Sequence, residues 1–237
     1  VTLSTTSPAT VVEGSTITYT ATVDNAVTGS DLVLTLSNGE QITIAVGQTT
    51  GSVSTVVRAD DAYAQGTTAL APVTITGNTG GNFENVATTG TVLTSVTDDA
   101  DTSTVTLSTT APATVVEGST ITYTATVDNA VTGSDLVLTL SNGQTITIAV
   151  GETTGSVAYP VRGDDAYAQG TTALAAVTIT ANTGGNFENV ATAGTVLTSV
   201  TDDQDTTTVT LSTTAPATVV EGSTITDRKS TRLNSSH

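Results

Sequence analysis

The sequence predicts an all-β protein made of tandem immunoglobulin-like β-sandwich domains with about seven strands each. Three observations lead to this prediction: a nearly unchanged repeat of 104 residues, apolar residues that alternate with polar ones, and an Asn-Gly pair between two alternating runs. A repeat of this length is far longer than one solenoid coil and has the size of a self-contained domain. One repeat therefore corresponds to one domain.

The repeats set the expected domain boundaries. Residues 1–104 and 105–208 align without a gap and differ at 13 positions, and residues 209–226 repeat 105–122 without a change. We expect two whole domains and the truncated start of a third, which is too short to fold alone and should be disordered or loosely docked. Near-verbatim copies are typical of proteins that span a distance or present many copies, because a single active site gives no reason to copy a whole domain.

Within a repeat, apolar and polar residues alternate in 16–23, 32–36, 42–46 and 73–75, as in half-buried antiparallel strands. Asn38 and Gly39 lie between two of these runs and predict a hairpin, because both residue types tolerate positive φ. Further strands are expected at 1–5, 51–57 and 91–97. Asp60–Gln65 is the one stretch that tolerates a helical turn.

The last eleven residues, 227–237, read DRKSTRLNSSH. This string is the translation of a common sequencing adapter, so we interpret it as a non-native tail. Three of the five basic residues and the only histidine, His237, lie in it. These residues therefore carry no weight in the functional reading.

The composition excludes several classes of function. The chain has no cysteine and a net charge of −17, so disulfides, thiol chemistry and cysteine zinc sites are excluded, and nucleic acid and anionic membranes should be repelled. No apolar run approaches the ~20 residues of a spanning helix. Residues 1–226 hold 21 acids and two bases, Arg58 and Arg162, so cations should be attracted. With neither an initiator Met nor a secretion signal at its start, the chain is expected to be an internal fragment.

Acidic residues gather in corresponding segments of the two repeats, including TDDAD and TDDQD at the domain junctions. Such carboxylates repel each other by roughly 1 kcal/mol per pair even in water. Ca²⁺ accepts six to eight oxygen ligands in flexible geometry, whereas softer metals need the His or Cys that the repeats lack. The candidate calcium ligands are Asp60, Asp61, Glu84, Asp98, Asp99 and Asp101 in the first repeat, Asp164, Asp165, Glu188, Asp202, Asp203 and Asp205 in the second, and Glu13 and Glu117 near the domain starts.

The alternative for any of these acids is a solvated loop position that keeps the protein soluble. We prefer that alternative for Asp24, Asp31 and Glu40, the last of which is Gln144 in the second repeat. Arg58 and Arg162 are interpreted as local charge partners of the neighbouring acids. No EF-hand loop and no RTX-type nonapeptide array is present.

The combined motifs VVEGSTITYTATV, DDAYAQG, GGNFENV and TDD-x-DT resemble the extender repeats of giant RTX-type bacterial adhesins, among them ice-binding and biofilm adhesins. The resemblance covers residues 1–226. It implies immunoglobulin-like domains strung end to end, with calcium at and near the linkers, on the outside of a Gram-negative cell. Linker ligands would be Asp98, Asp99, Asp101 and their copies, and the distal ligand would be bound by domains outside this fragment. Ice binding is not transferred to these repeats.

The sequence therefore predicts a structural spacer whose partners are the neighbouring identical repeats, with no contact to membrane or nucleic acid. The rival is a module that itself binds glycan or protein, but few aromatic residues are present to form a sugar platform. An enzyme is not expected, because the repeats contain no His, no Cys and no G-x-S-x-G motif. Paired acids such as Asp60 and Asp61 are explained by calcium without acid–base chemistry.

Overall fold

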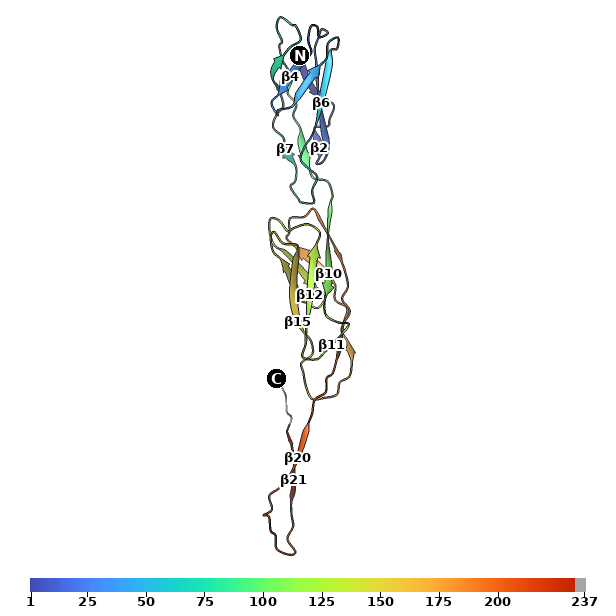
Figure 1. The fold of residues 1–237 in the computed structure, drawn as a ribbon, viewed down its shortest axis with the longest axis vertical. Helices are drawn as coiled ribbons and strands as arrows, with labels where there is room; N and C mark the ends of the chain where they lie inside the picture. The colour runs from blue at the N-terminus through green and yellow to red at the C-terminus, as the bar shows by residue number, and fades with distance from the viewer. Residues whose placement is uncertain (233–237) are drawn as a thin grey trace. The chain divides into compact units, whose positions relative to one another are not determined.

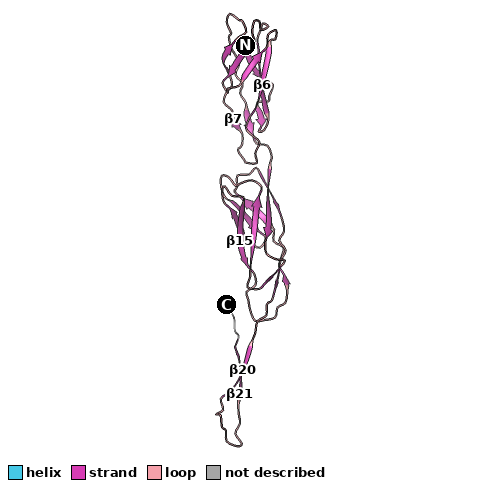
Figure 2. Cartoon of the chain, in the orientation of Figure 1, coloured by secondary structure: helices cyan, strands magenta, loops and turns pink. Residues whose placement is uncertain are grey.

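The computed structural model describes residues 1–232, and of 227–232 the backbone alone. The described chain is all-β, with no helix, and forms small sheets of two to four strands (Figures 1 and 2). It divides into two compact units, the first of Val1–Ser103 with Asn186–Asn189, the second of Thr104–Gly185 with the residues from Val190 onward. None of the described residues forms a helix long and apolar enough to cross a membrane.

The strands of the first repeat are short, and several have only two or three residues. They are β1 (Thr2–Thr5), β2 (Thr10–Val12), β3 (Thr16–Thr22), β4 (Leu32–Leu36), β5 (Gln41–Ile44), β6 (Thr50–Val56), β7 (Thr68–Ala69), β8 (Ile75–Thr79) and β9 (Ser95–Thr97).

The second repeat follows the same order with one further strand. Its strands are β10 (Thr102–Thr109), β11 (Thr114–Val116), β12 (Thr120–Val127), β13 (Leu136–Leu140), β14 (Thr145–Ile148), β15 (Thr154–Pro160), β16 (Thr172–Ala173), β17 (Ile179–Thr183), β18 (Asn189–Ala193) and β19 (Ser199–Thr201).

Two sheets of the first unit, β1-β3-β6 and β5-β4-β8, form the layers of a sandwich. Their alternating apolar residues meet in one core, which includes Ile17 and Tyr19 from β3 and Leu34 from β4. The alternation in the sequence thus predicted the inward faces correctly. Val46 is an exception, because it follows the end of β5 and is 50% exposed.

The hairpin predicted at Asn38-Gly39 is confirmed, since β4 and β5 pair antiparallel on either side of it. The Gly39 amide donates to the Leu36 carbonyl at 3.0 Å, and Gly39 alone of the two takes a positive φ, of 90°. The helical turn considered at Asp60–Gln65 is wrong: these residues form an extended loop held by hydrogen bonds to Asp61 and Asp98.

A third sheet, β2-β9-β7, extends the first unit beyond the sandwich. Its strands β2 and β9 run parallel, with Val11 opposite Val96, and β7 pairs antiparallel with β9. Parallel strands need a long connection between them, and here almost the whole repeat separates the two. Short-range sequence patterns do not reveal such a pairing. The strand expected at 91–97 is accordingly limited to β9, while Val92 forms an isolated bridge with Val73.

Beyond the second repeat, β20 (Thr208–Thr213) pairs antiparallel with β21 (Asp227–Arg232). The truncated third copy is therefore joined by backbone pairing to the segment that we interpret as an adapter-derived tail. The end of that tail, 233–237 with His237, lies outside the described residues.

Leu34→Ala should lower the free energy of unfolding by about 3 kcal/mol, because it opens a cavity at a side chain with no solvent exposure. The matched control is Leu93→Ala, whose side chain is 66% exposed, and it should change the same quantity by less than about 0.5 kcal/mol. Urea unfolding of the full chain measures both, and equal effects would contradict the proposed core.

Candidate metal centre

Three chain segments meet at the end of the first unit where β2 and β9 stop. Because β2 and β9 are parallel, the residues that follow them, Glu13 and Asp98, emerge at the same edge, and the Glu13 amide donates to the Thr97 carbonyl at 2.9 Å. The third segment follows β6, whose last residue, Val56, lies opposite Thr16 of β3. The topology therefore collects acids that are up to 86 residues apart in the sequence.

Gly14 allows the third segment to approach. It has a positive φ of 67°, and its amide donates to the Arg58 carbonyl at 2.8 Å. A Cβ on Gly14 would lie 3.0 Å from the Cβ of Asp60, closer than side chains normally pack. Glycine in VVEGS thus lets Asp60 lie directly beside Glu13.

Glu13 is the buried member of this group, with 4% of the residue exposed. Its Oε2 accepts a hydrogen bond from Arg58 Nε at 2.9 Å, whereas its Oε1 is buried without a hydrogen-bond partner among the described residues. A buried carboxylate oxygen without a donor is costly, and an ion-pair partner on the other oxygen does not satisfy it.

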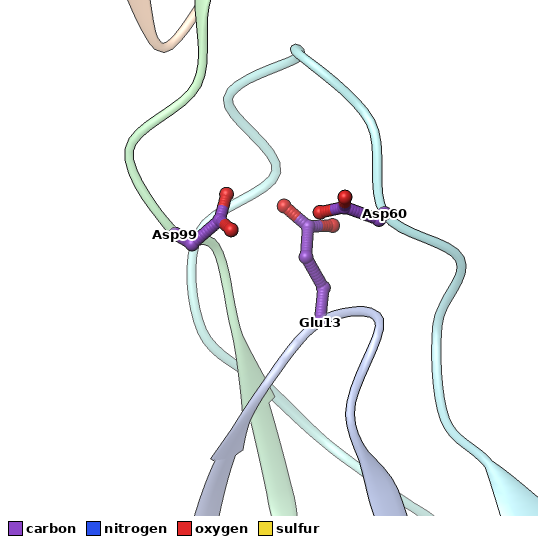
Figure 3. A group of neighbouring side chains, drawn as sticks. All are labelled: Glu13, Asp60 and Asp99. Carbon is purple, nitrogen blue, oxygen red and sulfur yellow. The ribbon is translucent and has the colours of Figure 1, made fainter.

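Carboxylate oxygens of Glu13, Asp60 and Asp99 lie within 4.8 Å of one another, and the last two residues are exposed (Figure 3). Repulsion from Asp99 and Asp101, with smaller effects of burial and of Asp61, raises the pKa of Asp60. These three oxygens come from three different segments and point toward a common space, as a set of cation ligands must.

Two of the predicted ligands are instead bound by donors of the protein. Burial by itself would raise the pKa of Asp98, but the amides of Gly66 and Gln65 and the Arg58 guanidinium outweigh it and hold the pKa below its usual range. Those amides donate to Asp98 Oδ2 at 2.6 and 2.8 Å. Asp61 accepts from the Tyr63 amide at 2.8 Å and from the Gln65 side chain. Both carboxylates shape the loop that carries Asp60.

Glu84 does not join this group. It is exposed in the loop beside Val1, whose terminal amine donates to the Ala87 carbonyl. Figure 1 shows the N-terminus at the opposite end of the unit from β2, the strand that Glu13 follows. The GGNFENV motif occurs in both repeats, and the glutamate of its second copy, Glu188, is the one near the other acids. Glu188 lies in the 186–189 segment, which belongs to the first unit. Its Oε2 accepts from the Asp101 amide at 2.6 Å, and its Oε1 is buried without a hydrogen-bond partner among the described residues.

Glu188 forms a second acidic group with Glu13 and Asp98, again with oxygens within 4.8 Å. Burial raises the pKa of Glu188, the Asp101 amide opposes the rise, and Glu13 and Asp99 add to it. Two carboxylates this close can share either a proton, which the raised pKa of Glu188 favours, or a cation that binds both. The first unit thus contains two buried carboxylate oxygens without a hydrogen-bond partner among the described residues, one on Glu13 and one on Glu188.

The second unit builds a matching acidic group from its own copies. Glu117 is 5% exposed and accepts from Arg162 Nε at 2.8 Å, and its oxygens lie within 4.8 Å of those of Asp164 and Asp203. Asp202 is held by Arg162 and by the Gln169 and Gly170 amides, as Asp98 is in the first unit.

Asp165 repeats the loop contact of Asp61, accepting from the Tyr167 amide at 2.8 Å. The acids line an open hollow of about 550 Å³. Burial and, after it, repulsion from Asp164 and Asp203 raise the pKa of Asp205 in this hollow.

The ligand chemistry of both centres is oxygen alone, which suits Ca²⁺ or another hard cation and not a soft metal. Arg58 is a charge partner of acids, as expected, and the acids that it pairs with are Glu13 and Asp98, not the adjacent Asp60 and Asp61. The sequence did not reveal the amides of residues 65 and 66 as donors. Their one signal is Gly66, which has a positive φ of 68°.

Repeated β-sandwich units with an acid-lined end define the class of this protein. Within that class, the chain belongs to the LapA domain family, whose model matches residues 1–99 and 101–203. This is a family of large bacterial surface adhesins. The finer resemblance to RTX-type extender repeats stays a prediction.

No curated protein matches the chain. Among solved structures, the chain is similar to a crystal structure of Salmonella alpha-2-macroglobulin reacted with methylamine. The identity is 13% and the TM-score 0.25, over 90% of this chain and 17% of that one. A likeness at this TM-score carries no argument about fold or function.

Arg58→Ala should lower the melting temperature, because it leaves the buried Glu13 carboxylate without its cationic partner. Adding Glu13→Gln to this variant should restore part of the loss, since a neutral amide is less costly to bury than an unpaired charge. Circular-dichroism melting of the two variants and of Glu13→Gln alone measures the coupling. An Arg58→Ala chain that melts like the unchanged protein would contradict the pairing.

The pKa shifts predict that, in EDTA, the stability of the chain passes through a maximum as the pH is lowered. Asp60 and Asp205 have raised pKa values, so they add stability as the pH falls through their folded pKa toward the unfolded value of about 3.9. Asp98 and Asp202 have lowered pKa values, so the stability they supply above about 3.9 is lost as the pH falls through their folded pKa.

The melting temperature should therefore rise from neutral pH toward about pH 4 and fall below it. Asp60→Asn with Asp205→Asn should reduce the rise, and Asp98→Asn with Asp202→Asn should reduce the fall. A steady decrease from neutral pH in the unchanged chain would show that the acids do not repel as described.

Proposed function

We propose that these repeats are structural spacers of a bacterial surface adhesin and that Ca²⁺ bound by the acidic ends stiffens the array. The observation that carries the proposal is the buried Glu13 carboxylate: its Oε1 has no donor among the described residues, and the carboxylate has an oxygen within 4.8 Å of oxygens of Asp60 and Asp99. A divalent cation would satisfy this oxygen and cancel the repulsion among the three acids.

The residues suited to hold the ion in the first unit are Glu13, Asp60 and Asp99, with Glu188 and Asp101 close by. In the second unit the matching set is Glu117, Asp164 and Asp203, with Asp205 in the same hollow. Asp61 and Asp98, with their copies Asp165 and Asp202, act by positioning the loop. When bound, calcium supplies positive charge and a coordination shell that several segments can share.

The mechanical effect follows from where these acids lie in the chain. Asp98, Asp99 and Asp101 immediately precede Ser103, where the first unit ends, so a cation held there would restrain the segment leading out of the unit. Without the cation, the self-repelling segment would act as a flexible tether. Because metal bound only by the folded state stabilises that state, calcium outside the cell would both stabilise and stiffen the repeats after secretion.

This role places the chain outside a Gram-negative cell, in an RTX-type adhesin that serves in attachment and biofilm formation, with the distal ligand bound by domains beyond these repeats. It requires no enzymatic activity, and the family of surface adhesins agrees with it. The rival function is direct binding of glycan or protein by each repeat. At the acidic end, the exposed aromatic side chain that could contact a sugar is Tyr167. A glycan array probed with the full chain separates the two, because a spacer should bind no glycan.

Millimolar Ca²⁺ should raise the melting temperature of the full chain, by the equivalent of about 2.7 kcal/mol when calcium is at one hundred times its Kd. Asp60→Asn and Asp99→Asn should each reduce the rise, whereas Asp24→Asn, an exposed acid outside both acidic groups, should not. Melting curves in EDTA and in calcium measure this.

X-ray scattering of the same samples tests the stiffening. In calcium the distribution of interatomic distances should narrow toward one extended form, and in EDTA it should broaden. If neither stability nor scattering responds to calcium, the calcium mechanism is wrong.

A further inference from the structure

Each repeat contains one tyrosine and one phenylalanine in two segments that are unchanged between the repeats. DDAYAQG carries Tyr63 and Tyr167, and GGNFENV carries Phe83 and Phe187. These are the chain's only phenylalanines. If the two segments contact each other, the protein therefore contains two copies of each of the two contacting surfaces.

One such contact is made within the first unit, between Tyr63 and the 186–189 segment. The rings of Tyr63 and Phe187 stack with centroids 5.6 Å apart and an interplanar angle of 24°. Backbone hydrogen bonds flank the rings: the Ala64 amide donates to Asn186 at 3.0 Å, and the Glu188 amide donates to Ala62 at 3.1 Å. Phe187 is 9% exposed in this arrangement. The two segments therefore recognise each other through both side chains and backbone.

The other two members of the set are more open. Phe83 is half-buried and lines a hollow of about 200 Å³ together with Val1 and Asn85. Tyr167 is 65% exposed and lines the hollow at the acidic end of the second unit. No ring contact to either is present among the described residues, whereas their identical counterparts stack on each other.

We propose that Tyr167 of one molecule docks on Phe83 of a second copy of this chain, with the same backbone pairing that joins residues 62–64 to 186–188. Phe83 packs in part against the core of the first unit, and its segment has the same sequence, the same amide donors and the same carbonyl acceptors as that of Phe187, so the contact seen once can form again on the open side of the ring. Because the two surfaces differ, the contact is heterologous and leads to open head-to-tail chains, not closed dimers. In a longer array the following repeat would supply the partner of Tyr167.

The test uses the two phenylalanines as separate reporters. The full chain is labelled with 4-fluorophenylalanine, and its two ¹⁹F signals are assigned with Phe83→Leu and Phe187→Leu. Raising the chain concentration from about 50 µM to about 1 mM should shift the Phe83 signal. The upper value is of the order of the effective concentration that a short linker gives two domains within one molecule. The Phe187 signal should stay in place, because its ring is already stacked.

Tyr167→Ala should abolish the concentration dependence, and Leu197→Ala, another exposed apolar residue of the same unit at 68%, should preserve it. The decisive step is complementation. Adding unlabelled Phe83→Ala chain, which keeps Tyr167, to labelled Tyr167→Ala chain should restore the shift. Adding unlabelled Tyr167→Ala chain should not.

A Phe83 signal that ignores concentration up to about 1 mM overturns the proposal, as does a shift that survives Tyr167→Ala. The proposal rests on the spacer function only in that repeats follow one another, because the interactions that carry it are ring stacking and backbone hydrogen bonds. The series is therefore run in EDTA and in calcium. A Phe83 shift without any calcium effect on melting would reject the calcium mechanism alone, and the converse result would reject the docking alone.

Discussion

The arrangement of side chains at the acidic end of the first unit depends on the buried carboxylate of Glu13. Arg58 donates to one of its oxygens, the other has no donor among the described residues, and the carboxylate lies beside those of Asp60 and Asp99. Because Arg58 is also bound to Asp98, no further protein cation in the repeat is left to balance these acids. A cation from outside the protein would supply the missing positive charge, and oxygen ligands favour a hard cation.

The parallel pairing of β2 with β9 places that carboxylate. It brings the second strand of the repeat against the last, so the residues that follow β2 and β9 meet at the acidic edge. The second unit repeats the pairing between β11 and β19, and with it the group of Glu117, Asp164 and Asp203. A cation at this edge would therefore act on the segment by which the chain leaves each unit. The stiffening that we propose rests on this placement.

The sandwich was predictable from local patterns, and the site was predictable only in part. Alternation identified the inward residues of β3, β4 and β5, because a strand with one buried face has apolar residues at every second position. Clustering identified the acids, yet it could not separate Asp60 from Asp61 and Asp98, whose oxygens accept hydrogen bonds from backbone amides and from the side chains of Gln65 and Arg58. It also grouped Glu84 with acids at the opposite end, because only the long-range pairing of β2 with β9 defines which segments meet.

The most direct test of this account is equilibrium dialysis of the full chain against ⁴⁵Ca²⁺ at physiological ionic strength, beside the Glu13→Gln/Glu117→Gln double variant. The account predicts saturable binding of at least one ion per whole repeat, with sharply weaker binding in the variant. Glu152→Gln, an exposed acid outside the acidic groups, should bind like the unchanged protein. Absence of binding at millimolar calcium, or equal binding by the double variant, would contradict the central role of the buried carboxylate.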